Sequence, residues 1–171
     1  LSRTIDTFKN FIRDDKELVR VSITEDLNKA LDLLHATLKN NYIDVQVTIN
    51  DDLIIEIVEG ELIQVFINIL NNAKDVLIEK QIDEKWIKVD ISKKDELAIV
   101  TIEDNAGGIK KEILAKIFEP YFTTKHQSQG TGLGLHMSHK IISESCSGKL
   151  FVTNTQYGAK FTIEIPLQQN N

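Results

Sequence analysis

Residues 128–142, SQGTGLGLHMSHKII, give the backbone unusual freedom just where a helix is expected to begin. Three alternating glycines precede an apolar pattern at helical spacing: Gly130, Gly132 and Gly134. Backbone N–H groups at a glycine-rich helix N-terminus suit phosphate oxygens. The segment fits neither the phosphate loop G-x-x-x-x-G-K-[ST] nor the G-x-G-x-x-G turn that follows a strand. By itself, glycine alternation is therefore a weak signal for phosphate binding.

Asparagine gathers on one face of the helix expected at 61–79. Asn68, Asn72 and Asp75 fall at i, i+4 and i+7, so they share a face displaced from the apolar stripe. Asparagine is a poor helix former, so this cluster lowers helix propensity. An amide carbonyl is a hard oxygen ligand for Mg²⁺, and an amide NH₂ can donate to a phosphate. Solvated side chains that cap or bridge remain the alternative.

A turn with two glycines follows the strand expected at 97–104. Asp104 ends the strand, and Gly107 and Gly108 allow backbone angles that a side chain disfavours. A flat ligand could approach this main chain, and the carboxylate could accept a hydrogen bond from its exocyclic amine. Taken alone, the same residues also fit an ordinary turn.

The long polar segment 117–135 connects this region to the last helix. Loops of this length inside a compact domain are usually functional lids or disordered segments. Lys125 could reach a phosphate from this loop as a mobile positive charge, although a solvated lysine fits equally well.

Composition restricts the class of protein. The 171 residues are 42% hydrophobic and 27% charged, as in one soluble domain. The net charge of −6 argues against binding to nucleic acid or to an anionic membrane, because no basic field offsets the phosphates. A single cysteine, Cys146, cannot form an internal disulfide, which favours a reducing, cytoplasmic location.

The elements that must position these residues follow from periodicity. One helix is expected to begin after Ser22, which forms a capping box with Glu25. Further helices are expected over 61–79, over 110–118 and in a last segment that ends at about Ser145. A further strand-like alternation covers 19–23. Six segments are expected to form one mixed, mostly antiparallel sheet: 43–49, 53–58, 86–92, 97–104, 149–154 and 159–165. Helices on one face would make an α/β two-layer sandwich.

Four segments, in this order and spacing, resemble the ATP-binding catalytic domain of sensor histidine kinases. NILNNA resembles the N box, DNAGGI the first glycine box, FEPYFTTK the F box and GTGLGL the second glycine box. YGAKFTIEIP resembles the closing strand, with Gly158 as a further glycine position. The resemblance covers residues 19–167 and extends to the gyrase, Hsp90 and MutL ATPases.

The resemblance implies ATP and Mg²⁺ as ligands, and a long ATP lid. Asp104 would accept from the adenine amine, and Thr162 would lie beneath the base. Asn72, with Asn68, would hold Mg²⁺, and Asp75 would act through the metal or a water molecule. The other nucleotide contacts would come from the turn, the lid and the second glycine box: Ala106, Gly108, Ile109, Phe118, Thr124, Lys125, Gly130, Thr131, Gly132, Leu133, Gly134 and Leu135. Phe118 and Phe122 would anchor the lid.

Two positions depart from the family pattern. Many members carry glycine at the position of Ala106, so this turn is slightly stiffer. Some members carry a phosphate-contacting lysine at the position of Asp75, and an acid cannot make that contact directly.

The resemblance also bears on the reaction. The ATPase relatives place a water-activating glutamate at the position of Asn68, and an amide cannot act as a base at neutral pH. This favours phosphoryl transfer to a protein, supported by Asn68 and Lys125 as catalytic residues. A clamp-type ATPase and a degenerate nucleotide-binding interaction module remain the alternatives.

The expected phosphoacceptor is absent from the chain. None of the four histidines stands in an H-E-x-x-x-P-like setting: His35, His126, His136 and His139. The resemblance implies an acceptor on an upstream dimerisation hairpin, from the same or the partner protomer. Residues 1–14 resemble the end of that hairpin and 15–171 the catalytic domain. A response-regulator receiver domain and homodimerisation of the intact protein are further expectations.

Overall fold

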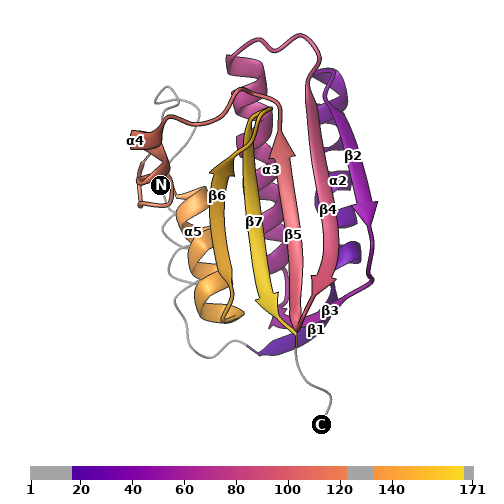
Figure 1. The fold of residues 1–171 in the computed structure, drawn as a ribbon. Coiled ribbons are helices and arrows are strands. Elements are labelled where there is room, and N and C mark those ends of the chain that lie inside the picture. The colour runs from indigo at the N-terminus through magenta and orange to yellow at the C-terminus, as the bar shows by residue number, and fades with distance from the viewer. Residues whose placement is uncertain (1–16, 123–132, 168–171) are drawn as a thin grey trace, which may run out of the picture.

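The computed structural model describes residues 17–122 and 133–167 (Figure 1). Five strands form the main sheet: β2 (Asp44–Ile49), β4 (Trp86–Lys94), β5 (Leu97–Asp104), β6 (Lys149–Asn154) and β7 (Ala159–Pro166). Their order across the sheet is β2-β4-β5-β7-β6. The hairpin end expected at 1–14 lies outside the described residues.

The sheet is mixed and mostly antiparallel, as the sequence predicted. Only β2 and β4 pair in parallel, while the other three neighbouring pairs are antiparallel. The segment expected at 53–58 does not join this sheet, which corrects the prediction. Instead, β3 (Ile54–Val58) pairs antiparallel with β1 (Leu18–Ser22) in a separate two-stranded sheet. Alternation identifies an extended segment but carries no information about its pairing partner.

Helices cover one face of the main sheet, which confirms the two-layer arrangement. They are α2 (Ile23–Asn40), α3 (Glu61–Glu79) and α5 (Gly134–Lys140), and α3 lies between the other two (Figure 1). A π-helical turn, η1 (Ile141–Ser145), continues α5 to the predicted end. α4 (Lys111–Leu114) is shorter than the helix expected at 110–118. Within the described ranges, no helix combines the length and apolar character needed to cross a bilayer.

Ser22 is the N-cap of α2, which confirms the Ser22 half of the predicted capping box. Ser22 Oγ accepts a hydrogen bond from the Glu25 backbone N–H at 3.2 Å. This contact satisfies one of the backbone donors that a helix N-terminus leaves without an intrahelical partner. It also fixes where the chain leaves β1 and turns into α2.

The core fills the space between the helices and the inner face of the sheet. Phe66 of α3 and Phe161 of β7 are its largest fully buried side chains. On β5 the inward positions are apolar until the last one, and Asp104 occupies that position. Because strand side chains alternate between faces, the fold itself directs this carboxylate inward at the end of the sheet.

Candidate functional site

Asp104 is a buried carboxylate held by the backbone of two neighbouring segments. Only 3% of the residue is exposed. Its Oδ1 accepts from the Ala106 N–H at 2.9 Å and from the Ala159 N–H at 3.4 Å. Both bonds end on Oδ1, so neither of them uses Oδ2.

The surroundings of Asp104 change its acidity. Burial raises the pKa of this carboxyl group, because loss of solvent disfavours the charged form. The N–H groups of Ala106 and Ala159 and the positive charge of Lys80 act to lower the pKa, whereas Glu103 adds to the increase. The net result is a pKa above the ordinary aspartate value.

The turn after Asp104 needs its glycines. Gly107 and Gly108 have φ values of +84° and +88°, in the left-handed region that favours glycine. The Gly107 N–H donates to the Tyr157 carbonyl at 3.0 Å, which ties the turn to the loop before β7. A Cβ on Gly108 would lie 3.0 Å from Asn154 Oδ1, so the space is also limited there.

Two asparagines outside the predicted site hold this turn in place. Asn105 accepts from the Trp86 N–H at 2.9 Å and donates to the Glu84 carbonyl at 2.6 Å. Asn154 accepts from the Ile109 N–H at 2.8 Å and donates to the Ile109 carbonyl at 2.7 Å. Asn105 lies within the first glycine box, DNAGGI, which was the one hint of its role in the sequence. No motif in the sequence pointed to Asn154.

Gly158 permits β7 to pack against Asp104. A Cβ at this position would lie 2.3 Å from the Asp104 carbonyl oxygen and 2.7 Å from Asp104 Oδ1. No side chain fits at such distances without displacing the backbone. The further glycine position predicted from the sequence therefore has a structural reason.

The sheet register separates Thr162 from Asp104. Phe161 and Ile163 pair with inward-facing residues of β5, whereas Thr162 pairs with Thr101 on the outer face. Asp104 shares the inner face, so the two side chains lie on opposite sides of the sheet. This corrects the expectation that Thr162 lies beneath a base held at Asp104. The alternation of apolar and polar residues along β7 agrees with this face, because successive side chains of a strand point to opposite faces.

The asparagine face of α3 lies against the start of α5. Asn68 Nδ2 donates to the Gly134 carbonyl and to Ser138 Oγ, each at 3.0 Å. Gln64 Nε2 donates to Asn68 Oδ1 at 2.8 Å. Both ends of the Asn68 amide are therefore engaged within the protein. This contact brings the N box and the end of the second glycine box together.

The other two polar residues of that face differ in their surroundings. Asn72 is half-buried, and no described residue hydrogen-bonds to its amide. Asp75 Oδ1 lies 3.3 Å from Lys74 Nζ, so its charge is partly compensated. Asn72 is therefore better placed than Asn68 to offer an oxygen to a ligand.

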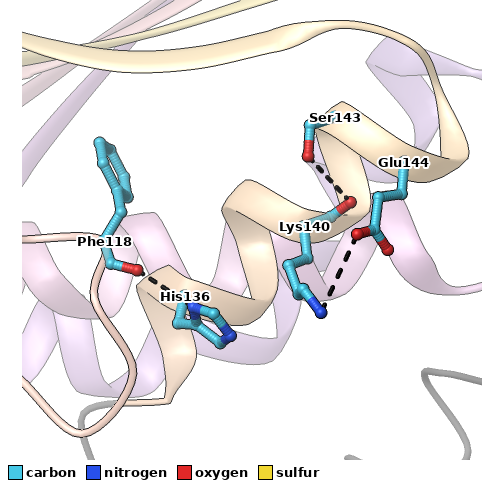
Figure 2. A network of polar contacts seen from close by, with 5 residues as sticks. All are labelled: Phe118, His136, Lys140, Ser143 and Glu144. Atoms are coloured by element: carbon cyan, nitrogen blue, oxygen red, sulfur yellow. Dashed lines mark hydrogen bonds and ion pairs between the residues drawn. The ribbon is translucent and has the colours of Figure 1, made fainter.

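Phe118 is anchored on α5 by two histidines. His136 Nδ1 lies 3.1 Å from the Phe118 carbonyl, which can only accept, so Nδ1 carries the proton (Figure 2). The Phe118 ring packs against the His139 ring at 5.1 Å and against Phe161 at 6.2 Å, measured between centroids. Farther along, Lys140 and Glu144 form an ion pair at 3.9 Å. His136 and His139 thus serve packing, as their setting in the sequence suggested.

The remaining predicted positions divide into three groups. Ala106 and Leu133 are buried, and Leu135 packs against the core, so these side chains support the backbone around the site. Ile109 and Phe122 are half-buried, and Phe122 donates its N–H to the Glu119 carbonyl. Five positions lie outside the described residues, and their nucleotide contacts stay predictions: Thr124, Lys125, Gly130, Thr131 and Gly132.

A family profile spans the elements that carry these residues. The profile described as histidine kinase-, DNA gyrase B- and HSP90-like ATPase matches residues 57–169. The chain belongs to this family. The match runs from β3 through α3, the glycine turn and β7, so it includes every site segment described above.

Within this family, the chain is similar in sequence to two-component sensor and sporulation kinases. The chain is 33% identical over 142 residues to the two-component sensor PprA of Pseudomonas aeruginosa. It is 35% identical over 151 residues to sporulation kinase E of Bacillus subtilis. The alignments cover 81% and 86% of this chain but only 15% and 20% of those proteins. The chain therefore spans a small part of the length of these relatives.

Solved structures of the family share the fold. The catalytic domain of the histidine kinase ThkA aligns with a TM-score of 0.77 and 31% identity, over 88% of this chain and 95% of that domain. A structure of ThkA in complex with the response regulator TrrA aligns with a TM-score of 0.73 and 26% identity. That alignment covers 98% of this chain and 48% of the ThkA chain.

Proposed function

We propose that the chain binds ATP with Mg²⁺ and is the catalytic domain of a two-component sensor histidine kinase. The observation that carries the proposal is the buried carboxylate of Asp104 beside the double-glycine turn. A carboxylate whose Oδ2 takes no part in the hydrogen bonds from Ala106 and Ala159 suits the exocyclic amine of adenine. Family membership and the named sensor kinases support the same choice.

The proposed arrangement places the phosphates near the start of α5. Asn68 ties this start to α3, so the end of the second glycine box at Gly134 has a defined position. Asn72 offers a neutral amide oxygen from the same helix face, which fits a hard cation. Among the described residues, no group of three or more His, Cys, Asp or Glu could hold a metal ion. Mg²⁺ would therefore be held by Asn72 together with phosphate oxygens, and would neutralise their charge.

The proposed reaction is transfer of the γ-phosphoryl group to a histidine. The acceptor lies on a helical hairpin supplied by the same or a partner protomer, and ADP is the leaving group. The phosphoryl group then passes to an aspartate of a response regulator, as the ThkA–TrrA complex suggests by analogy. The proposal includes a cytoplasmic location of the domain, within a homodimeric protein. Asn68 supports the preference for transfer, because its engaged, neutral amide cannot activate water.

A radiolabel assay tests transfer against hydrolysis. The 171-residue chain is incubated with γ-labelled ATP and Mg²⁺, with and without a dimeric acceptor hairpin from a histidine kinase relative. We expect negligible release of phosphate without the hairpin and acid-labile label on the hairpin when it is present. Asn72→Ala should reduce the labelling by at least about tenfold, because the proposed metal ligand is lost. Rapid, hairpin-independent release of phosphate would instead indicate a clamp-type ATPase.

A further inference from the structure

Lys80, at the end of α3, makes two hydrogen bonds to the glycine turn. Its Nζ donates to the Ala106 carbonyl at 2.8 Å and to the Gly108 carbonyl at 3.0 Å. The residue forms the C-cap of α3, and its N–H donates to the Val76 carbonyl at 3.0 Å. The long side chain thus connects a fixed helix end to the segment after Asp104.

We propose that Lys80 is a positioning residue for adenine recognition, which rests on the function proposed above. It acts through two groups that would contact the base: the carboxylate of Asp104 and the backbone of the glycine turn. No sequence motif assigns this role, because Lys80 lies outside the N box, the F box and both glycine boxes.

Lys80 holds the backbone of the turn that follows Asp104. The peptide groups of Ala106 link the lysine to the carboxylate, since its N–H donates to Asp104 and its carbonyl accepts from Lys80. On the other side of the turn, Asn154 holds both backbone groups of Ile109. The two left-handed glycines are therefore held from both sides. Glycine is the residue that loses most conformational freedom on ordering, so a turn held in advance binds a flat ligand at a lower entropic cost.

The charge of Lys80 also acts on the ionisation of Asp104. A charged carboxylate accepts a hydrogen bond from an amine more strongly than a protonated one does. Burial favours the protonated form of Asp104, and Glu103 acts in the same direction, whereas the charge of Lys80 favours the ionised form. Lys80 and Glu103 are the charged side chains that act on Asp104 within the described part of the chain.

The alternative role for Lys80 is purely structural. A lysine at a helix C-terminus interacts favourably with the helix dipole, and this effect would change stability alone. A structural effect would also weaken the binding of every nucleotide by the same factor. The two roles therefore differ in base selectivity.

Calorimetry with two nucleotides separates these roles. ADP carries the exocyclic amine, and purine riboside diphosphate carries the same phosphates without it. We expect Lys80→Met to weaken the binding of ADP about fivefold and the binding of the analogue less than about twofold. The expected effect is modest because the interaction of Lys80 with the site is charge-assisted but partly screened by solvent. Lys80→Arg keeps the charge and should restore most of the affinity. Lys94→Met, which removes an equal charge at the other end of the β4–β5 hairpin, is the matched control and should change neither affinity.

The pH dependence gives a second readout. Without Lys80 the pKa of Asp104 should rise further, so the loss of ADP affinity on acidification should begin at a higher pH. The purine analogue should not show this change, because it lacks the amine.

The outcomes separate this inference from the function on which it rests. If the parent chain does not bind ADP, the proposed function fails, and the role of Lys80 fails with it. If the parent chain binds and Asp104→Asn removes binding, but Lys80→Met keeps the parent selectivity and pH profile, only the role of Lys80 is refuted. Equal losses for both nucleotides would also refute it, in favour of the structural role.

Discussion

Replacing Gly158 by alanine perturbs the centre of the candidate site with one methyl group. The added Cβ would meet the Asp104 carbonyl oxygen at 2.3 Å, Asp104 Oδ1 at 2.7 Å and the Ala106 nitrogen at 2.9 Å. All three atoms belong to backbone or to a buried side chain, so none can simply move away. Overpacking of this kind costs about 1–3 kcal/mol, and contact with backbone places Gly158→Ala near the upper limit. We therefore expect a loss of about 3 kcal/mol and a melting temperature about 6–12 °C lower.

Urea unfolding and ADP titration of the same samples provide the assay. Relief of the clash must displace either β7 or Asp104, so ADP affinity should fall by at least about tenfold, equivalent to about 1.4 kcal/mol. Gly60→Ala is the matched control, because its Cβ would have no neighbour within 4 Å although φ is +86°. That variant should lose about 1–2 kcal/mol from backbone strain alone and keep its ADP affinity, since Gly60 begins α3 at the end opposite to the glycine turn. Parent-like stability and affinity in Gly158→Ala would refute the close packing of β7 against Asp104.

Three further outcomes follow from buried or half-buried groups. Ser138→Ala removes a fully buried hydroxyl that accepts a hydrogen bond from Asn68 and donates one to the Gly134 carbonyl at 2.9 Å. Urea unfolding should show that the free energy of unfolding falls by about 1–2 kcal/mol. Ser138→Thr keeps the hydroxyl and should recover part of this loss. Asp104→Asn should stabilise the nucleotide-free protein at neutral pH on the order of 1 kcal/mol, because the native carboxyl has a raised pKa. Between the unfolded value of 3.8 and the raised native value, the native state binds more protons, so parent stability falls as pH rises. The advantage of the variant in pH-dependent urea unfolding should therefore shrink toward pH 3.8, and a constant difference would contradict this reasoning. Burial raises the pKa of the half-buried Cys146 thiol to about 12, so a thiol reagent at pH 8 should react more slowly with the native protein than with the urea-unfolded chain, and equal rates would contradict this.

Local pattern was sufficient for most of the elements. Taken alone, Asp104 and its glycines also fitted an ordinary turn, and they were predicted as a site because four segments in order resemble the sensor histidine kinase family. Pairing was harder: β3 joins β1 rather than the main sheet, since alternation does not encode a partner. The family resemblance led to the expectation that Thr162 lies beneath the base, whereas the register directs it to the outer face.

Long-range side-chain contacts were beyond prediction from a single sequence. Lys80 and Asn154 reach the glycine turn across 26 and 45 residues of chain, respectively. Neither residue stands in a motif, because its role comes from where α3 and β6 end in space. Asn68 was recognised as important, but its contacts with α5 required the packing of two helices.

The central claim is that Asp104 recognises the base of an adenine nucleotide. Calorimetric titration of the 171-residue chain with ADP, with and without Mg²⁺, tests it most directly when Asp104→Asn is measured in parallel. We predict saturable one-site binding by the parent chain that Mg²⁺ strengthens. We also predict an affinity at least about tenfold lower in a folded Asp104→Asn variant, because the asparagine amide is a weaker acceptor than a carboxylate. A folded parent chain that does not bind ADP, or equal affinities for parent and variant, would contradict the account.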